Sequence, residues 1–314
     1  MEPALPNHRF GKYEILGRLG RGGMADVFRA RVISGPLEGT LVAIKRLLPE
    51  LAHDPISVDQ FTTEADLSRW LCHPSIVRVL EVGVLGEVYF MVMEWVDGRD
   101  LWQLLSRCRK RGILMPIPLA VHVTRVVLDA LGFAHQVALP SGQPLGLVHC
   151  DVSPSNVFIS RMGEVKLGDF GVARGRLQAL GLDSDAPIGG KPFYLSAELL
   201  EGAITPGADL WAAAVLLYEA LTLERPFTGA TPPEVFAAIR QGKYAPLRNL
   251  RPEIPEGLAA VVDRALSRNP NKRFASASLF ASALEPHLGT RLQPSAQLAA
   301  LVSDLFGATP DPRR

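Results

Sequence analysis

The sequence predicts an α+β protein of two lobes, a small β-rich lobe followed by a larger helical one. Segments rich in β-branched and aromatic residues are concentrated in about the first ninety residues. After Asp97-Gly98 the apolar residues recur with the spacing of helices instead. A chain of 314 residues is also near the upper limit for one hydrophobic core, so two lobes are expected.

The change in periodicity sets the expected domain limits. We expect an N-terminal lead over 1–12, a first lobe over 13–93, a hinge over 94–98, a second lobe over 99–289 and a tail over 290–314. Within the tail, Ser295 is suited to cap a short helix that ends near Phe306.

Each lobe has its own expected elements. The first should contain strands over 13–19, 26–32, 41–47, 77–84 and 87–93, and one helix from about 57 to 71. The second should contain helices over 101–109, 118–137, 208–223, 233–241 and 257–266, and a strand pair over 157–159 and 165–167.

Composition narrows the function classes. The formal net charge is +1, which gives no overall attraction to nucleic acid or anionic lipid, so no nucleic-acid partner is expected. Three cysteines without a CxxC pair favour reduced thiols in the cytoplasm. Residues 1–10 lack the apolar core of a signal peptide. The longest apolar run, 210–218, is shorter than the span of about 20 residues that a membrane helix needs, so no membrane segment is expected.

Two short patterns in the first lobe are suited to binding phosphates. Gly20, Gly22 and Gly23 lie between two expected strands, where backbone N–H groups are able to close over a phosphate. A simple hairpin turn is the alternative. Lys45 stands in an apolar strand, and a buried lysine needs a partner, for which Glu64 on the expected helix is suited. A solvent-facing lysine on an edge strand is the alternative.

Three polar residues of the second lobe are suited to handling Mg-ATP. Asp151 and Asn156 share a loop before the short strand pair, and Asp169 follows that pair. Asn156 and Asp169 offer the hard oxygen ligands that magnesium takes, while Asp151 is able to accept the proton of an acceptor hydroxyl. A structural aspartate is the alternative for any one of them. Their joint spacing, with Phe170-Gly171 next, favours chemistry.

Four motifs resemble, in their order along the chain, those of the eukaryotic-like Ser/Thr protein kinases of bacterial type. They are the glycine turn, Lys45, the loop from His149 to Asn156, and Asp169-Phe170-Gly171. Residues 190–198, 209–211, 226–227 and 269–274 resemble later kinase motifs, and the resemblance spans about residues 10 to 288. It implies the bilobal protein-kinase fold and transfer of the ATP γ-phosphoryl group to Ser or Thr of protein substrates in a signalling role. It also implies that Arg273 pairs with Glu198.

The same resemblance implies a nucleotide site with ATP and Mg²⁺ or Mn²⁺ as cofactors. Glu94 and Val96 would present the hinge backbone to adenine, Met93 would be the gatekeeper, and Asp100 would meet the ribose. The full implied set is Leu19, Gly20, Gly22, Gly23, Val27, Ala43, Lys45, Met93, Glu94, Val96, Asp100 and Phe158, with Val27, Ala43 and Phe158 around the base. Core packing is the ordinary alternative for the apolar members. Expected partners are ATP and protein substrates, and a partner for the tail is left open.

Cys150 departs from the family pattern. It replaces the arginine that, in the family, is held by a phosphate on the activation segment. Between Val172 and Gly189 the only hydroxyl is that of Ser184. We therefore expect activity that does not depend on phosphorylation of this segment. For Cys150 itself, we expect a small buried thiol that fills space rather than a redox role.

Ser153 and Lys191 form the second departure. Ser153 replaces the catalytic-loop lysine, and Lys191 stands where the family usually has a threonine. Our hypothesis is that the Lys191 ammonium reaches the γ-phosphate and Asp151, which would make Lys191 part of the catalytic set with Lys45, Glu64, Asp151, Asn156 and Asp169. An exposed loop lysine is the alternative.

Because of these departures from the family pattern, two other functions remain open. A pseudokinase that binds ATP as a scaffold is favoured by Cys150 and Ser153, although Lys45, Asp151 and Asp169 are all kept. A small-molecule phosphotransferase would share only the catalytic core. Residues 209–211 and the Glu198–Arg273 pair favour a protein substrate instead.

Overall fold

The computed structural model describes residues 8–139, 141–170, 191–289 and 293–307. These form two compact units, which are described here one at a time. The β-rich unit comprises the described residues up to Cys72 and Val77–Asp97, and the helical unit comprises His73–Ile76 and the described residues from Gly98 to Gly307. His73–Ile76 belong to the helical unit because Ser75 O accepts a hydrogen bond from Leu167 N at 2.8 Å.

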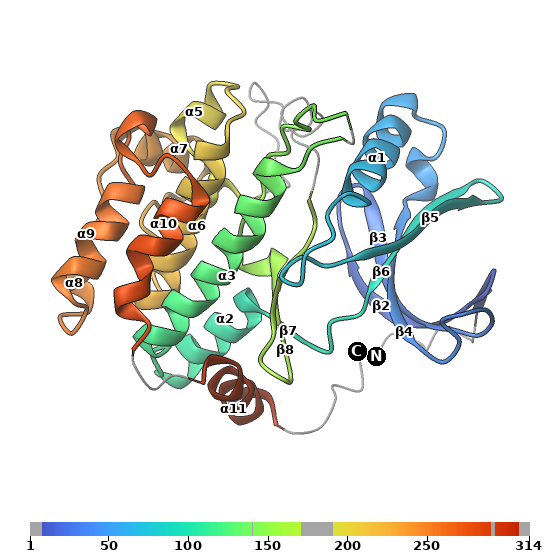
Figure 1. The fold of residues 1–314 in the computed structure, drawn as a ribbon, viewed down its shortest axis with the longest axis horizontal. Helices are drawn as coiled ribbons and strands as arrows, with labels where there is room; N and C mark the ends of the chain where they lie inside the picture. The colour runs from blue at the N-terminus through green and yellow to red at the C-terminus, as the bar shows by residue number, and fades with distance from the viewer. Residues whose placement is uncertain (1–7, 140, 171–190, 290–292, 308–314) are drawn as a thin grey trace. The chain divides into compact units, whose positions relative to one another are not determined.

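The β-rich unit is one antiparallel sheet with a helix packed against it (Figure 1). The strands run in the order β1-β2-β3-β4-β6-β5. Their bounds are β1 (His8–Phe10), β2 (Tyr13–Arg21), β3 (Ala25–Val32), β4 (Leu41–Leu47), β5 (Val79–Leu85) and β6 (Val88–Glu94). Helix α1 (Pro55–Ser68) follows a short 3₁₀ turn, η1 (Pro49–Leu51), and contacts β5 and β6. It begins where the Asp54 carboxylate accepts a hydrogen bond from Ser57 N at 3.0 Å, as an N-cap should.

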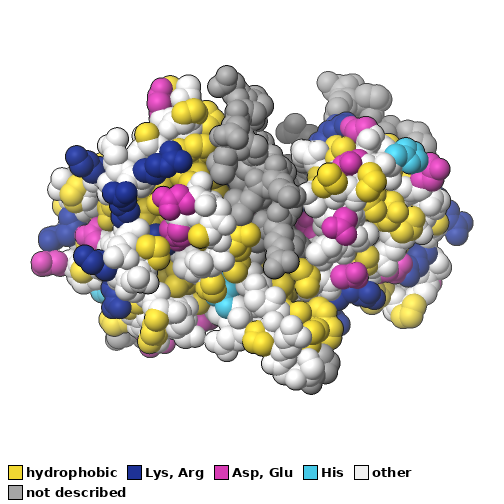
Figure 2. All heavy atoms as spheres, turned by 90° about the horizontal axis from the view of Figure 1, so that it is seen from above, with side chains coloured by type: hydrophobic (Ala, Val, Ile, Leu, Met, Phe, Trp, Pro, Cys, Tyr) yellow, Lys and Arg dark blue, Asp and Glu magenta, His cyan; other side chains and the backbone are white. Residues whose placement is uncertain are grey.

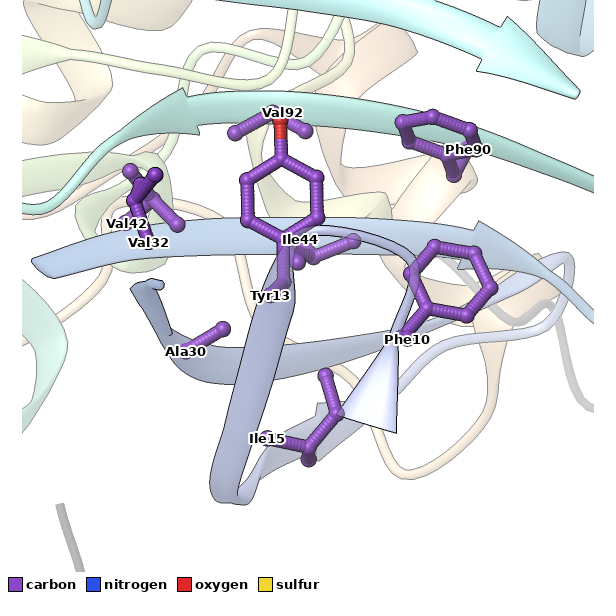
Figure 3. Close-up of a cluster of buried hydrophobic side chains, with 9 residues drawn as sticks. All are labelled: Phe10, Tyr13, Ile15, Ala30, Val32, Val42, Ile44, Phe90 and Val92. Carbon is purple, nitrogen blue, oxygen red and sulfur yellow. The ribbon is translucent and has the colours of Figure 1, made fainter. Parts of the chain in front are cut away.

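Both faces of this sheet bury apolar side chains, as the alternation along its strands requires. Figure 3 shows one cluster, in which Phe10 and Phe90 meet edge to face with ring centroids 5.2 Å apart. Its members are Phe10, Tyr13, Ile15, Ala30, Val32, Val42, Ile44, Phe90 and Val92. A second cluster lies between the sheet and α1, and includes Phe61 and Ala65 from the helix and Met91 and Met93 from β6.

The helical unit is built around α3 and α6, which pack against each other. Its elements are β7 (Gly98–Asp100), α2 (Leu101–Arg111), α3 (Ile117–Gln136), η2 (Pro154–Asn156), β8 (Val157–Ser160), β9 (Val165–Leu167), η3 (Pro192–Tyr194), α5 (Ala197–Leu200), α6 (Pro206–Thr222), α7 (Pro232–Gln241), α8 (Leu247–Leu250), α9 (Glu256–Ala265), η4 (Pro270–Lys272), α10 (Ala277–Leu284), η5 (Glu285–His287) and α11 (Pro294–Phe306). Strands β7, β8 and β9 form a small antiparallel sheet.

The expected elements are present within a few residues, and several short ones were missed. The sequence did not predict β1, β7, α5, α8 or α10. Helix α10 has only eight residues, but Ala277, Phe280, Ala281 and Leu284 bury it against α3 and α9. A helix this short is marginal alone, so packing rather than local propensity stabilises it.

One helix among the described residues, α3, is long and apolar enough to cross a membrane by length and composition. The longest uninterrupted apolar run in the sequence, 210–218, lies in α6 instead. In the structure, 56% of the most apolar stretch of α3 is buried, and α3 packs against α6, α10 and β9. These are the properties of a core helix.

Charged side chains are mixed on the face drawn in Figure 2. Among the described residues on this face, lysine and arginine lie together with aspartate, glutamate and neutral residues. This agrees with the net charge of +1.

Helix α11, the predicted tail helix, is part of the helical unit. Ser295 does not cap it as expected, because the helix already begins at Pro294 and its N-cap residue is Gln293. Leu298, Val302 and Leu305 are buried, and α11 contacts α2, α3 and β8. In Figure 1 it lies beside α2. Two arginines of α2 bind the carbonyls at its C-terminal end: Arg107 Nε donates to Leu305 O at 3.1 Å, and Arg111 Nη1 donates to Asp304 O at 2.9 Å. Cations suit this end because its carbonyls have no partner within the helix.

A glycine substitution tests this docking. Gly163 has φ +78°, and a Cβ added there would lie 1.8 Å from Ser295 O in α11. Gly142 has φ +83°, and a Cβ there would meet nothing within 4 Å. Both alanine variants bear the backbone strain, but only Gly163→Ala must displace α11. We expect Gly163→Ala to lower the free energy of unfolding by about 1–3 kcal/mol more than Gly142→Ala, measured by urea denaturation. Equal losses would show that α11 does not dock there.

Candidate active site

Lys45 and Glu64 form a largely buried ion pair in the β-rich unit. Lys45 Nζ on β4 donates to Glu64 Oε1 on α1 at 2.6 Å, and their side chains are only 15% and 11% exposed. Lys45 is therefore not a solvent-facing lysine, and the pairing expected from the sequence is present. A charge held at this depth needs such a partner.

Sheet register brings several of the expected nucleotide residues onto the Lys45 face. Val27 lies opposite Lys45, and Ala43 lies opposite Met93. Directly opposed residues of antiparallel strands point to the same face, and so do residues two apart along a strand. Val27, Ala43, Lys45 and Met93 therefore share one face, which is also the face that packs on α1.

The glycine turn connects β2 and β3. Leu19 and Gly20 belong to the end of β2, and Gly22 N donates to Ala25 O at 2.8 Å across the turn. A Cβ added at Gly20 or Gly23 would meet nothing within 4 Å. The backbone here is thus open on the side where these side chains would be, as a phosphate-covering loop requires.

The remaining residues expected at a nucleotide lie near the ends of the two units in the sequence. Glu94 ends β6, and its carboxylate accepts a hydrogen bond from Arg78 N at 2.8 Å. Val96 follows it in the chain. In the helical unit, Asp100 caps α2 by accepting from Gln103 N at 2.8 Å, and it lies opposite Phe158 in the small sheet. Asp100 therefore has a structural role besides its expected contact with ribose, which stays a prediction.

Asp209 anchors the loop that carries Asp151. Its carboxylate is fully buried and accepts hydrogen bonds from His149 N at 2.8 Å and Cys150 N at 2.9 Å. His135 Nε2 lies 2.8 Å from the same group. Cys150 has φ +57°, a strained conformation for a residue with a side chain, and the two bonds from the loop to Asp209 hold it there. The sequence places Asp209 in a motif without indicating this role, for which the available signal is an aspartate inside the apolar helix α6.

Asp151, Asn156 and Lys191 meet in one polar cluster. Asn156 Nδ2 donates to Asp151 Oδ2 and to Asp151 O, both at 2.9 Å. Lys191 Nζ donates to Asn156 Oδ1 at 2.8 Å and lies 3.7 Å from Asp151 Oδ2. Ser153 is fully buried beside them, with its hydroxyl 3.4 Å from Asp151 O. A cation thus accompanies Asp151 although the loop itself lacks lysine.

Asp169 is attached to the same loop through its neighbours. Gly168 N donates to Asn156 O at 2.9 Å, and Gly168 O lies 3.1 Å from His149 Nε2. The rings of His149 and Phe170 have centroids 4.4 Å apart. Asp169 has φ +54°, a second strained residue in this region.

The donor set fits Mg²⁺ bound together with phosphates. Asn156 Oδ1 and the Asp169 carboxylate are hard oxygens, and magnesium is usually held by one or two protein carboxylates with substrate phosphates and water. Asn156 Oδ1 accepts the Lys191 hydrogen bond here, so Lys191 would have to move aside for Asn156 to bind the metal. Over the described ranges no cluster of three or more His, Cys, Asp or Glu is able to hold a metal by itself. The chemistry of these residues therefore suits a metal that arrives with a nucleotide.

Three other sequence expectations have different outcomes. The Glu198–Arg273 pair is present, with Arg273 Nη2 donating to Glu198 Oε2 at 2.9 Å. Cys150 is only partly buried, so the expectation of a buried space-filling thiol is wrong in degree; its conformation is set by the Asp209 bonds rather than by packing alone. Ser184 lies outside the described residues.

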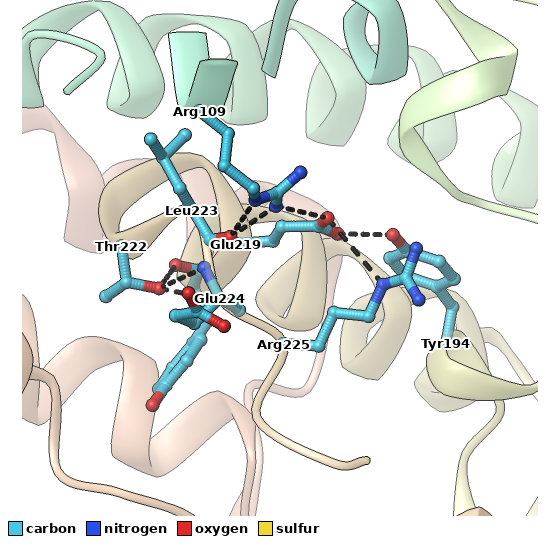
Figure 4. Close-up of polar contacts among 8 residues, drawn as sticks. Arg109, Tyr194, Glu219, Thr222, Leu223, Glu224 and Arg225 are labelled. Atoms are coloured by element: carbon cyan, nitrogen blue, oxygen red, sulfur yellow. Dashed lines mark hydrogen bonds and ion pairs between the residues drawn. The ribbon is translucent and has the colours of Figure 1, made fainter. Parts of the chain in front are cut away.

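A buried network around Glu219 was not predicted. Glu219 on α6 accepts a hydrogen bond from the Tyr194 hydroxyl, and Arg109 and Arg225 approach it at 3.6 and 3.7 Å (Figure 4). These residues come from four separate segments, so no local pattern in the chain indicated that they meet.

Comparisons with known proteins agree with this architecture. The model of the protein kinase domain matches residues 13–284. The tyrosine-protein kinase MasK of Myxococcus xanthus is 36% identical over 95% of this chain and 46% of its own length. The Ser/Thr-protein kinase PknB of Mycobacterium leprae is 34% identical over 87% of this chain and 42% of its own length. The chain therefore spans less than half the length of these curated relatives.

Solved structures show the same fold. The crystal structure of the Mycobacterium tuberculosis PknI kinase domain aligns with a TM-score of 0.65 and 26% identity, covering 90% of this chain and 98% of that one. The expected kinase fold class, with its β-rich and helical units, is confirmed, as is the resemblance to bacterial protein kinases of Ser/Thr type. The chain belongs to the protein kinase domain family.

Proposed function

We propose that this chain transfers the γ-phosphoryl group of ATP to hydroxyl groups of protein substrates in a signalling role, in the cytoplasm. The observation that carries the proposal is the Asp151–Asn156–Lys191 cluster, which joins a carboxylate, an amide and an ammonium group within hydrogen-bond or ion-pair distance. The three free cysteines support a cytoplasmic location.

Five residues have separate roles in the proposed transfer. Lys45, fixed by Glu64, binds the α- and β-phosphates. Asp151 orients the acceptor hydroxyl and accepts its proton. Asn156 and Asp169 would hold Mg²⁺, which would neutralise charge on the phosphates. Catalysis is then mostly positioning and charge stabilisation.

Serine or threonine is the acceptor that we propose, supported by the PknB relatives named as Ser/Thr kinases. Tyrosine is a second candidate, because MasK is named as a tyrosine-protein kinase and shares 36% of residues with this chain. An ATP-binding scaffold and a small-molecule phosphotransferase are the remaining alternatives. The scaffold is disfavoured because every expected phosphate and metal residue is kept.

One assay distinguishes these functions. Purified protein is incubated with Mg²⁺ and γ-labelled ATP, alone and with a generic protein acceptor, and the labelled amino acid is identified. We expect phosphoserine or phosphothreonine, lost on chelation of Mg²⁺ and in Asp151→Asn. Label on tyrosine alone would replace the proposed acceptor class, and ATP binding without any transfer would overturn the enzyme in favour of the scaffold.

Lys191 should take over the charge that Ser153 lacks. Replacing Lys191 by methionine should raise the barrier to transfer by about 2–4 kcal/mol, roughly 30- to 1,000-fold in kcat/KM. Lys243→Met, at an exposed lysine, is the matched control. Because Ser153 and Lys191 line the same cavity, adding Ser153→Lys to Lys191→Met should restore part of the rate. Near-normal kcat/KM in Lys191→Met would refute the exchange.

Activity should not depend on phosphorylation of the activation segment. Cys150 brings no positive charge to the loop, so no phosphate is needed to neutralise one. We expect Ser184→Ala, and wild-type protein treated with phosphatase, to retain their kcat in steady-state assays. Abolished turnover in either case would mean that a phosphate orders the site.

A further inference from the structure

A cavity of about 250 Å³ opens beside the catalytic loop in the helical unit. Residues 153–155 of that loop form part of its wall, and Lys191 and Arg225 contribute two cations. The remaining wall is aromatic, from Trp102, Phe193 and Tyr194. The described lining residues include no carboxylate. The cavity therefore combines positive charge with surfaces that exclude water.

The carboxylates behind this wall are already matched by cations. Glu219 is 2% exposed, and Arg109 and Arg225 lie 3.6 and 3.7 Å from its Oε1 (Figure 4). Asp151 has Lys191 at 3.7 Å. Among the described residues neither of these carboxylates lines the cavity, whereas Lys191 and Arg225 both do.

Tyr194, which also lines the cavity, adds no negative charge to its wall. Burial, together with the neighbouring Glu219, raises the pKa of the Tyr194 hydroxyl well above its ordinary value. The hydroxyl stays protonated and donates its hydrogen bond to Glu219. One of the lone pairs of Glu219 is therefore satisfied without Arg225.

Arg225 is held in place at the cavity. Its guanidinium lies over the Phe193 ring, 4.0 Å from the centroid. A guanidinium has five N–H donors in a planar fork suited to carboxylate and phosphate. The Arg225 side chain keeps 30% of its surface exposed, as does that of Lys191, so both cations remain accessible to a ligand.

From these contacts we propose that the cavity is a specificity pocket for an anionic side chain of the protein acceptor, close in sequence to the phosphorylated residue. The inference rests on the proposed function, because it is Asp151 that would hold the acceptor hydroxyl. Lys191 contacts Asp151 on one side and lines the cavity on the other. An acceptor bound at Asp151 would therefore place a side chain close in sequence beside the cavity that Arg225 also lines. The anion is a carboxylate or a phosphate already on the substrate.

Peptide acceptors test the pocket. Each peptide carries one acceptor serine, with Glu, phosphoserine, Ala or Arg placed in turn at each flanking position. At one or more positions we expect kcat/KM to be higher by about tenfold for an anionic residue than for arginine, the value of one charge-assisted hydrogen bond. The glutamate and phosphoserine arms show which anion is preferred.

Three variants separate binding of the anion by Arg225 from its pairing with Glu219. Arg225→Gln should abolish the anionic preference through KM, and Arg225→Lys should keep part of it. Arg109→Gln removes the other cation of Glu219, which does not line the cavity, and should leave the preference unchanged. Loss of preference in both Arg225→Gln and Arg109→Gln would assign Arg225 a structural role only and overturn the pocket.

Peptide binding keeps this test separate from the test of the enzyme. Binding of the same labelled peptides to Asp151→Asn protein is followed by fluorescence anisotropy, which needs no transfer. Tighter binding of anionic peptides, lost in Arg225→Gln, would support the pocket even if no phosphorylation occurred. Transfer to all peptides at equal rates with equal affinities would overturn the pocket and leave the kinase function standing.

Discussion

Replacing Asp151 by asparagine should lower kcat for phosphoryl transfer by about 10²- to 10⁴-fold, the usual contribution of a positioned acid–base group. Asparagine has the shape of aspartate but neither its charge nor its basicity. Asp151 Oδ2 now accepts a hydrogen bond from Asn156 Nδ2 and faces the Lys191 ammonium. The variant therefore removes the proton acceptor and one ion-pair partner, while the backbone bonds from the loop to Asp209 remain.

The measurement is single-turnover transfer at saturating ATP. Asp66→Asn is the matched control, because Asp66 is 71% exposed on α1 and only approaches Arg69 at 3.7 Å. ATP affinity and the unfolding temperature of Asp151→Asn should stay close to those of the wild type. A kcat within tenfold of the wild-type value would remove Asp151 from the chemistry.

The sequence could predict those contacts of the site that join residues close to one another in the chain. Asp151 and Asn156 are five residues apart, and their side chains do meet. Lys45 could be matched to Glu64 because a lysine inside an apolar strand needs a charged partner, and the expected helix carries a glutamate. Lys191 could be placed near Asp151 only through the family pattern, since 35 residues separate it from Asn156.

The sequence does not indicate which partners the tertiary anchors have. Asp209 binds loop atoms 59 and 60 residues away in the chain, and Arg109 reaches Leu223, 114 residues away. A buried carboxylate must find donors, but the sequence does not say which. The same limit explains the missed helices: α5 and α8 have four residues each and form only where the surrounding fold supports them.

Among the variants proposed here, Arg273→Ala should lower the free energy of unfolding the most. Arg273→Ala is expected to lower the free energy of unfolding by about 3–5 kcal/mol, because it strands the carboxylate of Glu198 in a largely buried position. Arg273 is 1% exposed at its side chain and binds Glu198, Ser267 O at 2.8 Å and Gly207 O at 3.0 Å. Its guanidinium also lies 4.7 Å from the Trp211 ring centroid. Arg31→Ala, which breaks an exposed pair with Glu14, should cost no more than about 1 kcal/mol.

The pH dependence of this loss identifies the ion pair as its cause. Burial alone would raise the pKa of Glu198, but the hydrogen bonds and charge of Arg273 outweigh it, so the pKa lies below its ordinary value of 4.5. A carboxyl whose pKa is lower in the folded state binds fewer protons there than in the unfolded chain. Its stabilisation is therefore complete above pH 4.5, begins to fall as the pH drops below that value, and is gone below the folded pKa. The difference in unfolding free energy between wild type and Glu198→Gln should follow this course in urea titrations from pH 7 downward, and a difference that stayed constant would assign the stabilisation to packing instead.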